Sequence, residues 1–304
     1  MAYLHSDREQ FRDAIDLAYE QTGVMVQAIE KDYYVTMLLR LLAQRMPYIV
    51  FKGGTSLSKC HKVIRRFSED IDITIDTLLS QGQKKKIKQA IVESAEELGM
   101  TIENLDETRS RRDYNRYVIA YDSVIPMASG ALKAAVLLET SYTAVSFPTV
   151  LLPVHSYIGD MMEQEAPDAI EEYNLNPFEM KVQGIDRTLA DKVFAVCDYY
   201  LQGKVAKHSR HLYDIYKLLP LVPQDENFKE LVKEVRAVRE QSVICPSALP
   251  EANVPELLEK IIKEKAYKQD YDTLTTQLLE ENVPYDTVIA TLKKVAESSI
   301  FENN

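Results

Sequence analysis

The chain has 304 residues, a formal net charge of −11 and a hydrophobic fraction of 46%. This length allows one large or two ordinary globular domains with a substantial core, and the negative charge argues against a protein that coats nucleic acid through its overall field. No apolar run approaches the roughly 18 residues of a membrane span, and the N-terminus lacks the apolar segment of a signal peptide. We therefore expect a cytoplasmic protein with no membrane association.

The first forty residues predict two helices. Apolar residues recur at helical spacing from Ser6 to about Arg45, and Gly23 separates the two segments. Ser6 or Asp7 is expected to cap the first helix. Residues 30–32 (Glu-Lys-Asp) fall early on the second helix, where they form either a solvent-facing ion pair or part of a functional site.

A strand, a glycine pair and a helix are expected next. Residues 48–51 read as a short buried strand, and Gly53-Gly54 supplies a turn that can adopt positive φ and let a phosphate approach the backbone. The stretch from Thr55 to Arg66 has a helical pattern. A strand, a glycine turn and a helix N-terminus together form an anion-binding arrangement.

Strict alternation marks residues 70–76 as a half-buried strand. Three isoleucines alternate with Asp70, Asp72 and Asp76, so the isoleucines face a core and the first two aspartates share the other face. Carboxylates two residues apart on a strand are roughly 7 Å apart at Cα, close enough to share two divalent cations about 4 Å apart. The alternative is a solvent-facing strand without a metal.

The remaining pattern indicates a mixed first part and a helical second part. A helix is predicted over 83–99 and ends at Gly99. Glu139 lies at the end of an otherwise apolar strand, where it is either a functional carboxylate or a residue that emerges into solvent. Three strands are predicted at 101–104, 116–121 and 131–142, loops with a short helix near 157–164 across 143–182, and helices at 185–201, 208–221, 226–239, 254–268, 271–281 and 285–301. We predict an α+β fold divided into 1–182 and 183–304.

Other residues have both a functional and a structural interpretation. Lys192 is either a phosphate-binding cation or a surface lysine, and Asp214 is either functional or an ion-pair partner of Arg210. The three cysteines and five histidines show neither CxxC nor HExxH spacing, so we expect reduced thiols and no zinc site. Four clusters of basic residues occur in the sequence. Each cluster alone indicates a solvated surface, whereas four clusters around one site would favour an anionic substrate. The clusters are Lys59, Lys62, Arg65 and Arg66; Lys84, Lys85, Lys86 and Lys88; Arg109, Arg111, Arg112 and Arg116 around Tyr114; and Lys204, Lys207, His208, Arg210 and His211.

Phosphoryl or nucleotidyl transfer needs carboxylate-bound metals, a cradle for the triphosphate and a cation for its outer charge. Asp70 and Asp72 could hold two Mg²⁺ ions, and Lys192 could contact a phosphate. The cradle would use the amides and hydroxyls of Gly53, Gly54, Thr55 and Ser56.

Four segments, in order, resemble the nucleotidyltransferase toxins of the AbiEii/AbiGii type, which include the MenT toxins. Residues 52–57 (Lys-Gly-Gly-Thr-Ser-Leu) look like their first motif, and residues 66–73 (Arg-Phe-Ser-Glu-Asp-Ile-Asp-Ile) look like their second. Residues 188–192 and 210–215 are similar to the third and fourth, and residues 30–33 look like the helix that precedes the first.

This resemblance implies a DNA polymerase β-like nucleotidyltransferase core, a helical C-terminal region, Mg²⁺ dependence and an NTP substrate. It also implies a cognate antitoxin encoded nearby and an acceptor at the 3′ end of tRNA. By the same resemblance Asp70 and Asp72 are metal ligands, Lys192 contacts a nucleotide phosphate and Asp214 positions the substrate or acts as a base. Ser56 and Ser68 would lie beside the metal and phosphates, and Glu139 would match the third carboxylate of the wider superfamily.

Three hypotheses for function follow. The first is a growth- or phage-inhibiting toxin that transfers a nucleoside monophosphate from an NTP to tRNA. The second keeps this chemistry but uses a small molecule or a protein as acceptor. The third is a non-catalytic module that binds an NTP and a partner.

Overall fold

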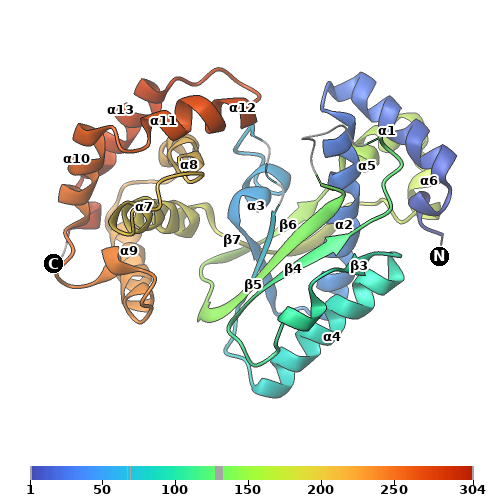
Figure 1. The fold of residues 1–304 in the computed structure, drawn as a ribbon, viewed down its shortest axis with the longest axis horizontal. Coiled ribbons are helices and arrows are strands. Elements are labelled where there is room, and N and C mark those ends of the chain that lie inside the picture. Colours follow the sequence, from blue (N-terminus) through green and yellow to red (C-terminus); the bar gives the residue numbers. More distant parts are fainter. Residues whose placement is uncertain (1, 67, 69, 127–132, 303–304) are drawn as a thin grey trace. The chain divides into compact units, whose positions relative to one another are not determined.

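The computed structural model describes residues 2–66, 68, 70–126 and 133–302. The chain forms two compact units, the first containing Met1–Cys60 and Glu69–Val182 and the second His61–Ser68 and Gln183–Asn304 (Figure 1). The first unit ends at Val182, and residues 61–68 belong to the second unit. Within the described residues, no helix combines the length and apolar character needed to cross a membrane.

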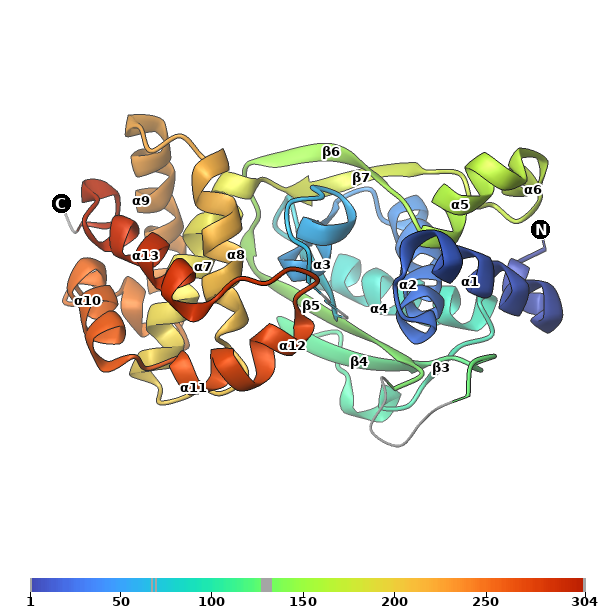
Figure 2. The same ribbon diagram turned by 90° about the horizontal axis from the view of Figure 1, so that it is seen from above.

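The first unit is built on a seven-stranded mixed sheet with the order β3-β4-β5-β2-β1-β7-β6. β2 pairs antiparallel with β1 and parallel with β5, and β1 also pairs parallel with β7. Figure 2 shows β6 running beside β7. This arrangement confirms the predicted α+β class. The strands are β1 Ile49–Lys52, β2 Asp70–Ile75, β3 Thr101–Ile102, β4 Tyr114–Ala120, β5 Ala135–Val145, β6 Thr149–Val154 and β7 Phe178–Gln183.

The alternation of apolar residues in β2 explains which face of the sheet is buried in the core. Ile71, Ile73 and Ile75 of β2 are at most 2% exposed, whereas Asp70 and Asp72 are half-buried on the opposite face. The isoleucines share one apolar cluster with Leu38 of α2 and Ile87 of α4. The helices of this unit are α1 Arg8–Thr22, α2 Val26–Arg45, α3 Gly53–Lys59, α4 Gln81–Glu97, α5 Tyr157–Glu165 and α6 Pro167–Glu172.

Local capping defines the first helix as expected. The side chain of Asp7 accepts hydrogen bonds from the amides of Glu9 and Gln10, both at 3.1 Å. Gly23 ends α1 at a φ of +69°, a conformation that glycine adopts without steric cost. Asp7, rather than Ser6, is therefore the cap.

The second unit is helical. Its α7 and α8 pack together, with Leu189, Val193, Leu212 and Ile215 fully buried. A π-helical turn at Tyr271–Thr275 interrupts the pattern predicted for 271–281. The helices are α7 Ile185–Leu201, α8 Arg210–Leu218, α9 Glu226–Glu240, α10 Val254–Glu264, α11 Lys268–Asp270, α12 Thr276–Leu278 and α13 Tyr285–Ala296.

The predicted helix over 55–66 was wrong beyond its first turns. α3 ends at Lys59, and the following segment is extended: Arg66 forms a bridge with Leu279, and the amide of Glu280 donates to the carbonyl of Arg65 at 3.0 Å. Pairing with a segment more than 200 residues away in the sequence overrides the local helical pattern.

Two strands in the stretch 143–182 were also missed. β7 joins the sheet beside β1, and β6 forms the edge beyond it. Pro153 lies within β6, and a proline is tolerated there because an edge strand has one side without a hydrogen-bonded neighbour. The prolines of this stretch predicted loops, so neither strand was expected.

Residues 30–32 are not a solvent-facing ion pair. Glu30 is 1% exposed and accepts hydrogen bonds from the Ser123 hydroxyl at 2.6 Å and the Val124 amide at 2.7 Å. Asp32 forms an ion pair with Lys59 and accepts a hydrogen bond from the Tyr157 amide at 3.0 Å. Because α2 is buried on nearly all sides, these carboxylates hold neighbouring segments instead of facing water.

Candidate active site

The predicted site residues divide between the two units, and each unit brings its own members together. The first unit contains the glycine turn (Gly53 to Ser56), the aspartates of β2 and Glu139. The second contains Ser68, which is half-buried, together with Lys192 and Asp214.

In the first unit, the glycine turn lies directly against the aspartate strand. Lys52, the last residue of β1, pairs with Asp72 of β2. Gly53 then turns the chain at a φ of +79°, and a Cβ added there would lie 1.9 Å from Oδ2 of Asp72. Glycine is therefore needed for both the backbone conformation and the approach of the Asp72 carboxylate.

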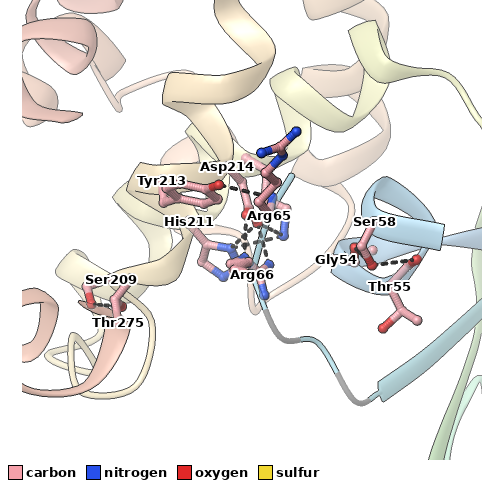
Figure 3. Close-up of polar contacts among 12 residues, drawn as sticks. Gly54, Thr55, Ser58, Arg65, Arg66, Ser209, His211, Tyr213, Asp214 and Thr275 are labelled. Carbon is pink, nitrogen blue, oxygen red and sulfur yellow. Dashed lines mark hydrogen bonds and ion pairs between the residues drawn. The ribbon is translucent and has the colours of Figure 1, made fainter. Parts of the chain in front are cut away.

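The hydroxyl groups after the glycine turn stabilise its conformation. Thr55 and Ser56 are both buried. The Thr55 hydroxyl donates to the carbonyl of Asp70 at 2.5 Å, and the Ser56 hydroxyl donates to the carbonyl of Gly53 at 2.9 Å. α3 is thereby fastened to β2 (Figure 3 shows Thr55 beside Gly54 and Ser58). Direct contact of these hydroxyls with a phosphate stays a prediction.

The Gly53→Ala variant is expected to be destabilised more than Gly99→Ala. Both positions have positive φ, which costs a non-glycine residue about 1–3 kcal/mol. Only at Gly53 would the added methyl also displace Asp72, since no atom lies within 4 Å of a Cβ at Gly99. A misplaced site carboxylate should in addition lower transfer activity by about 100-fold. Urea unfolding and initial rates test this, and equal losses in the two variants would contradict it.

A third carboxylate lies beside Asp72 on the same sheet face. Glu139 of β5 is the register partner of Asp72, and directly paired strand residues point to the same side. The Glu139 carboxylate also lies 3.7 Å from Nε of Arg116. Within the described residues, no three Asp, Glu, His or Cys side chains gather closely enough to hold one metal ion. Metal binding by Glu139 therefore stays a prediction.

Asp70 and Asp72 fit a magnesium site in chemical type. Mg²⁺ takes oxygen ligands, and one or two protein carboxylates usually suffice because substrate phosphates and water complete its coordination. The two aspartates are half-buried on one face of β2, and the Asp72 carboxylate is held against a glycine turn that leaves no room for another side chain.

In the second unit, Asp214 of α8 is the centre of a buried ionic cluster. It is fully buried and accepts two hydrogen bonds from the Arg66 guanidinium, at 2.7 and 2.9 Å (Figure 3). Nζ of Lys192 on α7 lies 2.9 Å from the same carboxylate and 3.1 Å from Nδ1 of His211. The bidentate pairing with Arg66 fixes the orientation of the Asp214 carboxylate.

The cluster controls the protonation of its members. Burial opposes ionisation of Asp214, but the charges of Arg66 and Lys192 hold the pKa of that carboxyl well below its usual value. Burial lowers the pKa of Lys192, while Asp214 acts in the opposite direction. Burial, followed by the charge of Lys192, lowers the pKa of His211 to about 3. His211 is therefore neutral, and its Nδ1 accepts a hydrogen bond from Lys192.

The structure gives both residues buried ionic partners. Lys192 is 9% exposed and is not a surface lysine, and the ion pairs of Asp214 are with Arg66 and Lys192, both buried. The sequence signals for Arg66 were its place in a basic cluster and its position at the start of the second motif, residues 66–73. In the cluster around residues 84–88, Lys84 pairs with Asp113, so the positive charge of Lys84 is partly compensated.

Replacement of His211 by glutamine is expected to flatten the pH dependence of stability. An unfolded histidine binds a proton below a pKa of about 6.5, whereas native His211 does so only near pH 3. The unfolded state thus binds more protons between these values, so this contribution is complete above about pH 6.5 and is lost as the pH falls. The free energy of unfolding, measured from pH 7 to 5, should fall more for the wild type than for His211→Gln. Parallel curves would contradict the assignment.

Comparisons with known proteins identify a family and a similar fold. Residues 36–291 match the family described as "Nucleotidyl transferase AbiEii toxin, Type IV TA system". The fold is similar to the solved structure of MenT4, a nucleotidyltransferase toxin from Mycobacterium tuberculosis H37Rv, with a TM-score of 0.51 and 16% sequence identity. That match covers 93% of this chain and 88% of MenT4. A comparison with curated protein sequences found no match.

Proposed function

Because the chain belongs to the AbiEii family of nucleotidyltransferase toxins of type IV toxin–antitoxin systems, we propose that it transfers a nucleoside monophosphate from an NTP to the 3′ end of tRNA. Modification of that end would block aminoacylation and so inhibit translation, which would restrict growth or phage propagation. Family membership also implies an antitoxin partner.

The first unit would supply the metal and triphosphate site. Asp70 and Asp72 would hold Mg²⁺, which when bound neutralises phosphate charge and polarises the α-phosphate. The Gly53-Gly54 turn would let the triphosphate approach the backbone, since it has no side chain to exclude it. The close approach of Asp72 to Gly53 is the observation that most directly supports this role.

Lys192 would be the cation that contacts a phosphate of the nucleotide. An ammonium group has three donors, and Lys192 directs two of them at Asp214 and His211. The third would be directed at a phosphate oxygen. Asp214 would keep Lys192 charged in spite of its burial, which makes Asp214 a positioning residue for Lys192.

The reaction is a balanced group transfer. The oxygen of the acceptor 3′-hydroxyl attacks the α-phosphorus, an O–P bond forms, and the bond from the α-phosphorus to the bridging oxygen breaks. Pyrophosphate leaves with that oxygen, and the hydroxyl proton passes to a carboxylate or to water. No further co-reactant is required.

A labelling experiment tests the proposal. Purified protein is incubated with Mg²⁺, each α-³²P-NTP in turn and total RNA, and label is located by electrophoresis and by nuclease mapping of tRNA 3′ ends. We expect one NTP to label the tRNA fraction. Label confined to a small-molecule or protein fraction would reject tRNA as acceptor, and NTP binding without transfer would favour a non-catalytic module.

A further inference from the structure

A row of charged side chains crosses the open face of the sheet in the first unit. Asp72 of β2 is the register partner of Glu139 of β5, and Glu139 is the register partner of Arg116 of β4. Register partners point to the same face, so the three side chains lie in line across adjacent strands. With neighbouring strands about 4.8 Å apart, the Arg116 backbone lies about 10 Å from that of Asp72.

The two carboxylates of this row face each other. Asp72 and Glu139 are like charges on directly paired residues, an arrangement that needs compensating groups. Arg116 lies 3.7 Å from the Glu139 carboxylate with a side chain that is 53% exposed, and the Tyr114 phenol interacts with the same carboxylate. Charged rows of this kind are often found at functional sites.

Tyr114 continues the same face next to Arg116. It lies two residues before Arg116 on β4, so its side chain points to the same face, and it is 51% exposed. Burial of the phenol, followed by the charge of Glu139, raises the pKa of Tyr114, so its ring stays neutral at physiological pH. An exposed aromatic ring and a guanidinium are thus presented side by side, on the face that carries Asp72.

Proteins commonly bind single-stranded nucleic acid through an aromatic ring and a neighbouring guanidinium. A base stacks on the aromatic ring, and a phosphate accepts paired hydrogen bonds from the arginine. The turn before β4 adds Arg111 and Arg112, both exposed, so a strand arriving at this face meets further positive charge. These arginines offset the overall charge of −11 at this one place.

We propose that Tyr114 and Arg116 bind the acceptor as a single-stranded RNA 3′ end, with a terminal base stacked on Tyr114 and a backbone phosphate on Arg116. This inference rests on the proposed function and adds to it the residues that hold the acceptor. Arg116 would also shield the acceptor phosphate from Glu139 and Asp72, which lie next in the row and would otherwise repel it.

Two measurements test the proposal. The first is the affinity for a 5′-fluorescent RNA of about ten nucleotides with a free 3′-hydroxyl, determined by anisotropy over a range of salt concentrations. The second is the KM for tRNA in the labelling reaction. Arg116→Ala should weaken RNA binding about tenfold or more and reduce the salt slope by about 0.7. Tyr114→Ala should weaken binding at least about fivefold, whereas Tyr114→Phe keeps the ring and should stay within about twofold of the wild type.

Arg12→Ala is the matched control, since Arg12 lies on α1 with a side chain 50% exposed. It removes the same charge and should leave RNA affinity unchanged, and no variant should alter the KM for the NTP. Unchanged RNA affinity in both Arg116→Ala and Tyr114→Ala would overturn the proposal, as would transfer to protein in place of RNA. RNA binding that depends on both residues without any transfer would uphold this surface and reject the proposed function instead.

Discussion

Replacement of Asp70 by asparagine is expected to lower nucleotidyl transfer by about 1,000-fold or more and to abolish toxicity, while the fold is retained. In the role proposed for Asp70, loss of one carboxylate ligand would remove several kcal/mol of charge stabilisation in the transition state, and about 1.4 kcal/mol corresponds to a tenfold change in rate. The substitution preserves side-chain volume on a half-buried strand position, so stability should change little. Initial rates with α-³²P-NTP and growth after induced expression measure the two effects.

Asp76→Asn is the matched control for Asp70→Asn. Asp76 follows β2 directly, and its carboxylate forms an ion pair with Lys181, away from the glycine turn. Loss of such a partly exposed pair costs about 0–1 kcal/mol of stability. Transfer by Asp76→Asn should therefore stay near the wild-type rate. If Asp70→Asn kept full activity, Asp70 would have no part in the chemistry.

Replacement of Asp214 by asparagine is expected to destabilise the second unit by about 3–5 kcal/mol. The change would leave Arg66 and Lys192 as buried cations without a counter-ion, and desolvated charges are costly when unpaired. The melting temperature should fall on the order of 10 °C. Circular dichroism during heating and urea unfolding provide the measurements.

Asp272→Asn is the control for stability, because this aspartate in the same unit forms an exposed pair with Lys268 and should contribute at most about 1 kcal/mol.

Lys192→Met separates the structural role of the cluster from its role in transfer. It leaves the Arg66–Asp214 pair intact, so the unit should stay folded while transfer is lost. Wild-type stability in Asp214→Asn, or wild-type transfer in Lys192→Met, would refute the respective role.

Several features could be predicted from the sequence because neighbouring residues determine them. The alternation in residues 70–76 indicated which face of β2 carries Asp70 and Asp72, and Asp7 and Gly23 delimited the first helix. Helical spacing indicated the all-helical second part. The order of four short motifs indicated the family, which the match over residues 36–291 confirms.

Other features depended on partners far away in the chain. Arg66 and Asp214 are 148 residues apart, and no local pattern reports which acid an arginine will meet. The extended segment before β2 follows from pairing with residues 279–280, and Glu30 is buried because α2 is covered by other elements.

Residue types at short spacing were thus enough to indicate the family, the α+β class and the shared face of Asp70 and Asp72 on β2. Contacts between distant segments were needed to show that Asp72 packs against Gly53 and that Asp214 pairs with Arg66 and Lys192. The same holds for Glu139 and Arg116, which continue the row from Asp72. Burial and strand register are properties of the assembled chain, because each is set by contacts between segments that are distant in sequence.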